Sequence, residues 1–316
     1  MKKVKRFATK YALVIVFAVL VITFGIVNPN FFTPLNLMNL VKQNTHILLV
    51  AVGISFVMMS GTLDLSVGYQ LAIVGVLTGR LMTAEGLPVW LAVVIGLAVG
   101  MLLGLINGGC AVIFKIDPMI VTIAMMTVFN GAANLLGKGL SYNNFPETFR
   151  VITRGTFLGL NIDIWIAIVA IAIVSFVYNK TYFGRFVKSM GGNEEATRLA
   201  GVNTKSMRVI TFVICGFFVA IAAMINISKL SIVNTQVGPG TEFTALTAAI
   251  LGGVSFNSGE GKMWGLVMGV FTLAIISNGM QLAGWNQYIQ YIIQGIILVL
   301  AIGFDHYQRS HLVEAD

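Results

Sequence analysis

The chain has 316 residues, of which 57% are hydrophobic and only 10% are charged, whereas about a quarter of the residues of an average soluble domain are charged. A soluble core cannot bury this much apolar surface, so the composition excludes an ordinary soluble protein and indicates one surrounded by membrane lipid. The formal net charge of +8 would suit a nucleic-acid-binding protein, but the basic residues flank apolar segments. We therefore expect no nucleic acid partner.

Apolar segments recur along the whole chain at close to the length of about 20 residues that a transmembrane helix needs. In chain order they cover residues 11–27, 47–63, 65–79, 86–114, 118–137, 164–179, 209–228, 243–259 and 263–304. The last segment is long enough for two helices that turn near residues 281–287. We predict an all-α, polytopic membrane protein with about ten transmembrane helices, folded as a single transmembrane domain over residues 1–316.

The basic residues are distributed unevenly between the two sides that this topology creates. With the N-terminus inside, the cytoplasmic segments are residues 1–10, 110–117, 180–208, 257–262 and 305–316, and they carry 14 of the 20 Lys and Arg. Cytoplasmic loops of membrane proteins carry an excess of Lys and Arg. The distribution therefore predicts that both termini are cytoplasmic.

Two Gly- and Ser-rich stretches interrupt the apolar pattern, at residues 60–68 and 252–262. Irregular backbone at membrane depth is tolerated only where protein or a water-filled cavity satisfies it. Paired interruptions of this kind indicate an internal repeat and a transport path, and here both fall on the same side, which predicts a parallel repeat. Two discontinuous helices are therefore expected, with ordinary tight loops as the open alternative.

Four glycines in the segment 86–114 lie four residues apart, namely Gly96, Gly100, Gly104 and Gly108. They form a smooth helical face on which another backbone packs closely. The partner helix belongs either to this chain or to a second copy.

The cytoplasmic loop at 180–208 contains the most specific local pattern. Asn193 is a favourable N-cap, Glu194 and Glu195 follow at the positive end of the helix dipole, and Arg198 lies near the negative end. Glu194 and Arg198 are four residues apart in the favourable order for an ion pair. Gly201 suits a left-handed helix stop. These features predict a capped helix of about seven residues.

Such a short helix is marginal in water, because isolated helices below about 12 residues rarely persist. Ala196, Leu199 and Ala200 give it a small apolar face. We expect a partner surface to hold this face. The alternatives are packing on the membrane surface or on the same chain.

Few polar side chains lie within the apolar segments. Carboxylates at membrane depth are costly and are functional by default, and Asp64 and Glu242 are the two acidic candidates. The candidates for a translocation path are Asp64, Ser66, Asn107, Asn226, Gln236 and Glu242. Asp64 as a helix cap, and the amides as interhelical hydrogen bonds, are the structural alternatives.

Several motifs occur together and in order. Residues 191–202 contain Gly-Gly-Asn-x-x-Ala-x-x-x-x-Gly-Val, which is similar to the coupling segment of ABC importer permeases of the ribose/monosaccharide class. Thr-Leu-Asp-Leu-Ser-Val-Gly at 62–68 resembles that family's Gly-Ile-Asp-Leu-Ser-Val-Gly. Further matches are Gly-Leu-Ile-Asn-Gly at 104–108, Pro-Met-Ile-Val-Thr at 118–122, Gly-Thr-Glu-Phe at 240–243 and Ile-Leu-Gly-Gly-Val-Ser at 250–255. Thr62 in place of glycine and Ala245 in place of an acidic residue depart from the family pattern.

The resemblance implies the transmembrane permease subunit of an ATP-binding-cassette importer in a bacterial inner membrane, moving a monosaccharide or similar small polar solute. It implies a separate cytoplasmic ATP-binding subunit that binds ATP and Mg, with no cofactor on this chain. It also implies a second permease chain, identical or different, and an extracytoplasmic solute-binding protein at the loops 138–161 and 228–242. Together with the helix pattern, the coupling residues are Gly191, Gly192, Asn193, Glu194, Glu195, Ala196, Arg198, Leu199 and Gly201.

The chain carries no ATPase motif of its own, so we expect a transport subunit and not an enzyme. Gly261-Lys262 resembles the end of a phosphate-binding loop, but Phe256 stands at its first glycine position and Met263 follows the lysine. No catalytic constellation and no metal-ligand spacing was found. Two alternatives stay open: an ABC permease for branched-chain amino acids or nucleosides, and an ATP-independent secondary transporter.

Overall fold

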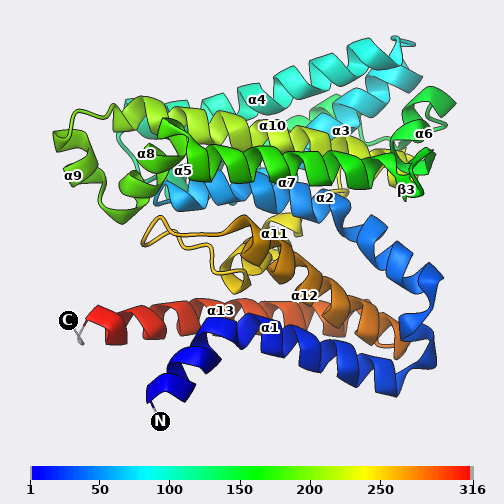
Figure 1. Cartoon of the computed structure of the whole chain (residues 1–316). Helices are drawn as coiled ribbons and strands as arrows, with labels where there is room; N and C mark the ends of the chain where they lie inside the picture. The colour runs from blue at the N-terminus through cyan, green and yellow to red at the C-terminus, as the bar shows by residue number, and fades with distance from the viewer. Residues whose placement is uncertain (1, 314–316) are drawn as a thin grey trace.

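The computed structural model describes the backbone of residues 2–313 and the side chains of residues 13–303, and it consists almost entirely of helices (Figure 1). The side chains of the predicted basic segments 1–10 and 305–316 lie outside the described residues. Most helices run lengthwise through the molecule, as expected of a bundle that crosses a bilayer.

Six helices are long and apolar enough to cross a membrane, counted over the described residues. They are α2 (Pro34–Met59), α4 (Val89–Phe114), α5 (Pro118–Gly137), α7 (Ile162–Lys180), α10 (Thr204–Leu230) and α12 (Met263–Leu282). The other predicted apolar segments are helical too, as α1 (Lys2–Val27), α3 (Val67–Thr83), α11 (Thr241–Leu251) and α13 (Gln287–Val313). The predicted class, an all-α polytopic membrane protein, is confirmed.

Short elements join these helices. They are the 3-10 helix η1 (Pro29–Phe32), the helices α6 (Glu147–Arg154), α8 (Tyr182–Gly192) and α9 (Glu194–Leu199), and the strands β1 (Tyr142–Asn143), β2 (Thr156–Phe157), β3 (Leu160–Asn161) and β4 (Ile232–Val233). β1 pairs antiparallel with β4, and β2 pairs antiparallel with β3. The β1–β4 pair joins the two loops that the sequence predicts on one outer face.

Local sequence explains where several helices begin and end. Asp117 caps α5, accepting a hydrogen bond of 2.8 Å from the backbone of Met119, and Pro118 occupies the first helical position, where its missing N–H costs nothing. Lys115 adopts a left-handed conformation with φ 57° and ends α4. The tight α4–α5 connection follows from these residues.

Both predicted helix breaks are present. Helix α2 ends at Met59 and α3 begins at Val67, while α11 ends at Leu251 and α12 begins at Met263. Gly61 and Gly253 have φ of 90° and 75°, a conformation that favours glycine. Each helix therefore ends where a glycine adopts this conformation, just after Met59 and Leu251.

The predicted segment 243–259 forms a helix, α11, that is too short to cross the membrane. Helix α11 has 11 residues, which at about 1.5 Å per residue covers roughly half of a hydrocarbon core about 30 Å thick. The segment before it lies along α3, since a Cβ at Gly79 would lie 2.6 Å from Val233 and a Cβ at Gly68 would collide with Glu242. Helix α11 consequently begins beside the first turn of α3.

The glycine face of α4 packs within this chain, on α10. A Cβ at Gly100 would lie 2.6 Å from Ala220 and from the carbonyl oxygen of Gly216, and one at Gly104 would collide with the carbonyl oxygen of Phe212. The sequence left open whether the partner helix belongs to this chain or to a second copy, and the structure shows that it is α10 of this chain.

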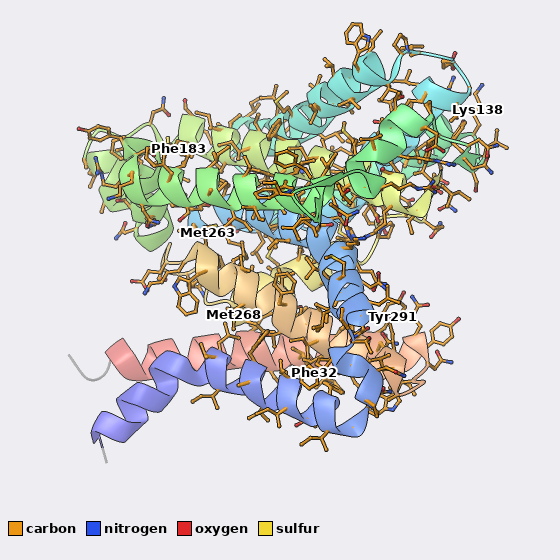
Figure 2. All side chains as sticks on the ribbon, turned by 45° about the vertical axis from the view of Figure 1, so that its right-hand side comes forward. Phe32, Lys138, Phe183, Met263, Met268 and Tyr291 are labelled. Atoms are coloured by element: carbon orange, nitrogen blue, oxygen red, sulfur yellow. The ribbon has the colours of Figure 1, made fainter. Side chains whose placement is uncertain are left out.

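The molecule has two ends, named here the α9 end and the α6 end. In Figure 1 the two chain termini and α9 lie at one end, and α6 and β3 lie at the other. Figure 2 likewise shows Phe183 of α8 and Met263 of α12 far from Lys138. At the α9 end, a polar hollow of about 370 Å³ is lined by the first break, the α4–α5 connection, α9 and α10.

Candidate functional site

The short loop helix α9 forms as the sequence predicts. The side-chain oxygen of Asn193 accepts a hydrogen bond of 2.8 Å from the backbone of Ala196, and Gly201 follows the helix with φ 88°. The helix has six residues, Glu194–Leu199. Its cap and its stop thus fix where the helix begins and where the chain turns away.

The ion pairs of α9 differ from the predicted one. Arg198 pairs with Glu195, three residues earlier, and Glu194 pairs with Arg208 of α10. The expected Glu194–Arg198 pair is absent from the described ion pairs, because Arg208 reaches Glu194 from the neighbouring helix. The hydrogen bond to Glu195 raises the pKa of Arg198. The Glu194–Arg208 pair fastens α9 to α10.

The apolar face of α9 is uncovered in the isolated chain. Leu199 is 78% exposed, and Ala196 and Ala200 are exposed as well. Thr197 is buried against the chain, and its hydroxyl donates to the carbonyl oxygen of Asn193. Helix α9 therefore rests on the protein by one side and presents its small apolar side outward.

The segment leading into α9 is wedged between the two helix breaks. A Cβ at Gly191 would collide with the carbonyl oxygen of Met59 and lie 2.6 Å from the Cα of Gly259. A Cβ at Gly61 would lie 3.3 Å from the Cα of Gly191, and one at Gly259 would collide with the carbonyl oxygen of Lys188. Backbone meets backbone at these points, so α8 contacts both breaks with no side chain between them.

Three of the predicted path residues, Asp64, Ser66 and Asn107, gather in one buried cluster at the start of α3. Asp64 accepts hydrogen bonds from the backbone and hydroxyl of Ser66, at 2.9 and 2.7 Å, and from Gln70 at 2.9 Å. Asn107 of α4 donates to Asp64 at 3.3 Å and to the hydroxyl of Ser66 at 2.8 Å. The cluster holds the first turn of α3 against α4.

Gln70 belongs to this cluster although the sequence analysis did not single it out. It lies four residues after Ser66, on the same helical face, and donates to both Asp64 and Ser66. That spacing is the signal that identifies it.

The other predicted path residues lie apart from the cluster. The buried carboxylate of Glu242 accepts a hydrogen bond of 2.9 Å from the backbone of Gly240 and packs against Gly68. Asn226 is buried on α10, and Gln236 is exposed in the segment before α11. Glu242 thus lies between the N-terminal ends of α3 and α11.

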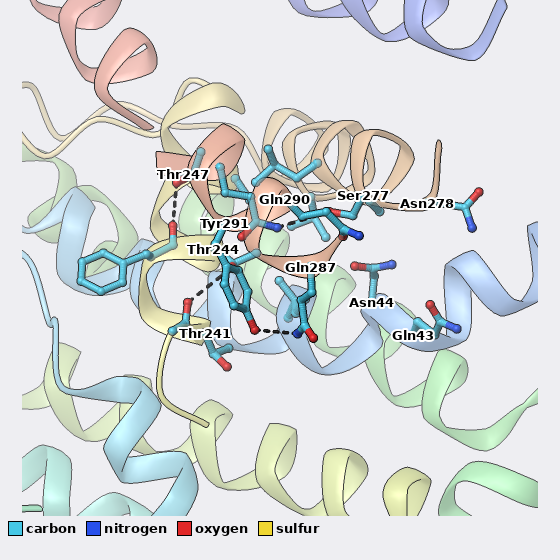
Figure 3. A pocket seen from close by; sticks show the side chains of 18 of the residues that line it. Gln43, Asn44, Thr241, Thr244, Thr247, Ser277, Asn278, Gln287, Gln290 and Tyr291 are labelled. Carbon is cyan, nitrogen blue, oxygen red and sulfur yellow. Dashed lines mark hydrogen bonds between the residues drawn. The ribbon is translucent and has the colours of Figure 1, made fainter. Parts of the chain in front are cut away.

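A cavity of about 1030 Å³ lies between α2, α11, α12 and α13 (Figure 3). None of the six predicted path residues lines it. Its amide side chains are Gln43, Asn44, Asn278, Gln281, Gln287, Gln290 and Gln294. Hydroxyls of threonine, serine and tyrosine and the imidazole of His46 complete its polar surface, and we refer to it as the amide cavity.

The spacing of three glutamines in the sequence is a signal for the amide cavity. Gln287, Gln290 and Gln294 follow one another at spacings of three and four, which places them on one face of a helix. This polar face was not predicted, because residues 263–304 contain no charged residue and were treated as a uniformly apolar segment.

Comparison with known proteins decides the family. Residues 36–302 match the model of the family described as branched-chain amino acid transport system / permease component. The chain belongs to this permease family. It is 30% identical to the ribose import permease protein of Haemophilus influenzae over 96% of this chain and 95% of the relative. It is 36% identical to the L-arabinose transport system permease protein of Escherichia coli (strain K12), over 95% and 92%.

A third relative of this permease family, the ribose import permease protein of Bacillus subtilis, is 34% identical over 91% of this chain and 89% of its own length. The resemblance to ribose/monosaccharide importer permeases is confirmed. Family membership and the six apolar helices together make the chain a multi-pass membrane permease. The family description names branched-chain amino acids, whereas these relatives are named for ribose and L-arabinose. Family membership alone therefore does not identify the solute of this chain.

Proposed function

We propose that this chain is the transmembrane subunit of an ATP-driven importer that moves a monosaccharide into the cytoplasm across a bacterial inner membrane. The observation that carries the proposal is α9, an exposed capped helix whose supporting segment contacts both helix breaks by backbone. The relatives, which are named for ribose and arabinose transport, favour a sugar over a branched-chain amino acid or a nucleoside.

The proposed sidedness puts the α9 end and both termini in the cytoplasm. The hollow at this end is lined by Lys115, Lys205 and Arg208, among other residues, and basic residues favour the cytoplasmic side of a membrane. A separate ATP-binding subunit would bind α9 and would hold ATP and Mg itself, so that this chain needs no cofactor.

The proposed coupling is mechanical. A push on Leu199 or Ala196 would move α8, because α8 and α9 are joined at Asn193, and α8 would move both breaks, because Gly191 touches Met59 and Gly259 by backbone. Close-packed interfaces transmit displacement instead of absorbing it. The two discontinuous helices would then change arrangement together.

At the α6 end, the proposed partner is an extracytoplasmic solute-binding protein. The β1–β4 pair joins the loops 138–161 and 228–242 into one surface, and Leu158 at the tip of the β2–β3 hairpin is 78% exposed. A second permease chain, identical or different, would complete the pathway. The secondary-transporter alternative offers no role for α9.

The proposed docking of α9 is tested with two leucines of equal exposure at opposite ends. We expect an ATPase with a phosphate-binding loop to co-purify with the wild-type chain in mild detergent, to be lost from Leu199→Asp, and to be retained by Leu158→Asp. An aspartate at Leu199 would place an unpaired charge in an apolar contact, which is costly. Retention of the ATPase by Leu199→Asp at normal expression would contradict the docking.

A further inference from the structure

The amide cavity has a lining that suits one chemical class of solute. Among the described residues that line it, none is Asp, Glu, Lys or Arg. Its volume of about 1030 Å³ is at the upper end of ligand pockets, which span roughly 300 to 1,000 Å³. A neutral solute therefore enters without leaving a charge unpaired.

The amides are oriented by the protein itself. The Nε2 groups of Gln290 and Gln294 donate to the carbonyl oxygen of Trp285 and to the hydroxyl of Ser277, both at 3.3 Å. Gln287 donates from its Nε2 to the hydroxyl of Tyr291 at 2.6 Å. Each of these bonds uses one of the amide's two N–H donors and leaves its carbonyl oxygen to accept other hydrogen bonds.

Helix α2 repeats this arrangement on the facing wall of the cavity. The Nδ2 of Asn44 donates to the carbonyl oxygen of Leu40 at 2.7 Å. The amide cavity thus presents carbonyl oxygens from two walls (Figure 3). Carbonyl oxygens accept hydrogen bonds from the hydroxyl groups of a polyhydroxylated solute, and the rings of Trp285 and Tyr291 offer apolar faces to its carbon skeleton.

An amino acid fits this lining poorly. Burying a carboxylate or an ammonium group without a counter-charge is costly. The N-terminus of α11 would attract a carboxylate, and its residues Gly240 and Thr241 line the cavity. The carboxylate of Glu242, however, already accepts a hydrogen bond from the backbone of Gly240. The backbone N–H of Gly240 is therefore already occupied and is not free to bind a solute carboxylate.

Polar and apolar parts of the lining are separated along the helices. The amides of α12 and α13 flank the turn between these helices at the α6 end (Figure 1). Val270, Leu273 and Leu298 line the cavity farther along the same helices, toward the α9 end. The cavity is polar toward the α6 end and has an apolar floor.

We propose that the amide cavity is the binding chamber for the sugar on its way through the membrane, and that the carbonyl oxygens of Asn44, Gln287, Gln290 and Gln294 bind its hydroxyl groups. This inference rests on the proposed function. Val270, Leu273 and Leu298 form the barrier beneath the bound sugar. Selection against charged solutes follows from the uncharged lining.

The first test asks whether the cavity contains water, independently of transport. Cys110 and Cys215, the free cysteines, are replaced by alanine, and Gln290→Cys is compared with Ile292→Cys, which is 62% exposed on another face of α13. We expect a charged, membrane-impermeant methanethiosulfonate reagent to modify Gln290→Cys at least about tenfold faster, since only a hydrated thiol forms the reactive thiolate. Equal rates would overturn the chamber.

The second test measures uptake of radiolabelled D-ribose and L-arabinose into energised cells that contain the whole transporter. Gln290→Leu/Gln294→Leu keeps the side-chain volume and removes two hydrogen-bonding groups, so uptake should fall about tenfold or more. Asn130→Leu, which removes an amide from the exposed face of α5, should leave uptake unchanged. The double variant should keep its co-purifying ATPase.

The outcomes separate the two proposals. Normal uptake by the double variant, in a transporter whose wild type takes up either pentose, would overturn the chamber and leave the proposed function standing. Absence of ATP-dependent uptake of either pentose by the wild type would instead count against sugar import. In that case, the thiol-modification rates still decide whether the cavity is hydrated.

Discussion

At the scale of single residues, the glycines of the α8–α9 segment have unequal roles. Gly191 has backbone on both sides, whereas a Cβ at its neighbour Gly192 would lie 3.5 Å from the carbonyl oxygen of Ser258, an ordinary contact distance. Gly201 has open space around it but φ 88°. The same residue type is therefore required by close approach at Gly191 and by backbone conformation at Gly201.

We expect Gly191→Ala to lower the free energy of unfolding by about 1–3 kcal/mol, the usual cost of overpacking a filled site. Gly192→Ala is the matched variant and should lower it much less. The measurement is thermal or denaturant unfolding of the detergent-solubilised protein, followed by fluorescence. Equal destabilisation by the two alanines would contradict the wedge of α8 between the breaks.

Gly201→Val should reduce coupling through backbone strain, because a β-branched residue is unfavourable at positive φ by about 1–3 kcal/mol. The strain would reorient α9 while leaving the membrane helices folded. ATP-driven uptake should fall in Gly201→Val and recover in Gly201→Asn, since asparagine tolerates the left-handed region. Normal uptake by Gly201→Val at normal expression would argue against a fixed orientation of α9.

Residue-scale features were predictable from sequence only where they are local. The cap at Asn193 and the stop at Gly201 depend on neighbours within a few positions, and both were identified. The ion pair of Glu194 was not, because its partner Arg208 is on the next helix and competes with the closer Arg198. Spacing alone gives the pairs that a helix permits and not the one that tertiary packing selects.

At the scale of elements, the break between α2 and α3 is held by a buried carboxylate and its donors. Asp64 accepts from Ser66, Gln70 and Asn107, which satisfies the charge and secures the first turn of α3. A carboxylate that accepts several hydrogen bonds is a strong local anchor. Asp64 does not cap the first amides of α3 itself but accepts from the backbone of Ser66, the residue before the helix, while its part in transport stays a prediction.

Two buried amides on neighbouring helices provide a matched test of this anchor. Asn107→Leu removes hydrogen bonds to Asp64 and Ser66 and should cost about 1.5–3 kcal/mol of stability, the range for bonds to a charged group. Asn226→Leu removes a side chain that makes no hydrogen bond within the described residues, and should cost less. Hydrogen exchange at the first turn of α3 should rise in Asn107→Leu alone. Equal exchange in both variants would show that Asn107 does not hold this turn.

The breaks themselves were predictable from their Gly and Ser content, but the depth of α11 was not. The segment of turns and bends after β4 lies along α3 and brings Glu242 to Gly68, far away in sequence. A prediction from apolar segments holds only for a helix that starts at the membrane surface, and α11 starts deeper, beside the first turn of α3. The predicted segment 243–259 therefore runs into the Gly-rich stretch, although the helix already ends at Leu251.

At the scale of the whole molecule, the two proposed sites lie apart along the length of the chain. The α9 end carries the proposed coupling helix and both breaks, and the amides of α12 and α13 that line the amide cavity lie near the α12–α13 turn. Helices α11 and α12, joined by the second break, connect the two regions. A displacement at the second break would move the apolar floor, because Val270 and Leu273 lie on α12.

The cavity could not be located from sequence, since one wall is α2, which ends at Met59, and the other walls are helices that begin at Thr241 or later. The sequence candidates for the path were chosen as isolated polar residues in apolar segments, and they lie in the Asp64 cluster or elsewhere. Their role in transport stays a prediction. The family was predictable, because its motifs are local and occur in order over most of the chain.

The most direct test of the central claim is uptake of radiolabelled D-ribose and L-arabinose into liposomes that contain the purified transporter, with its solute-binding protein on the outside and ATP sealed inside. We expect uptake with ATP, none with a non-hydrolysable analogue, and loss of ATP-driven uptake in Leu199→Asp. Uptake by this chain alone in liposomes without ATP would contradict the account and identify a secondary transporter.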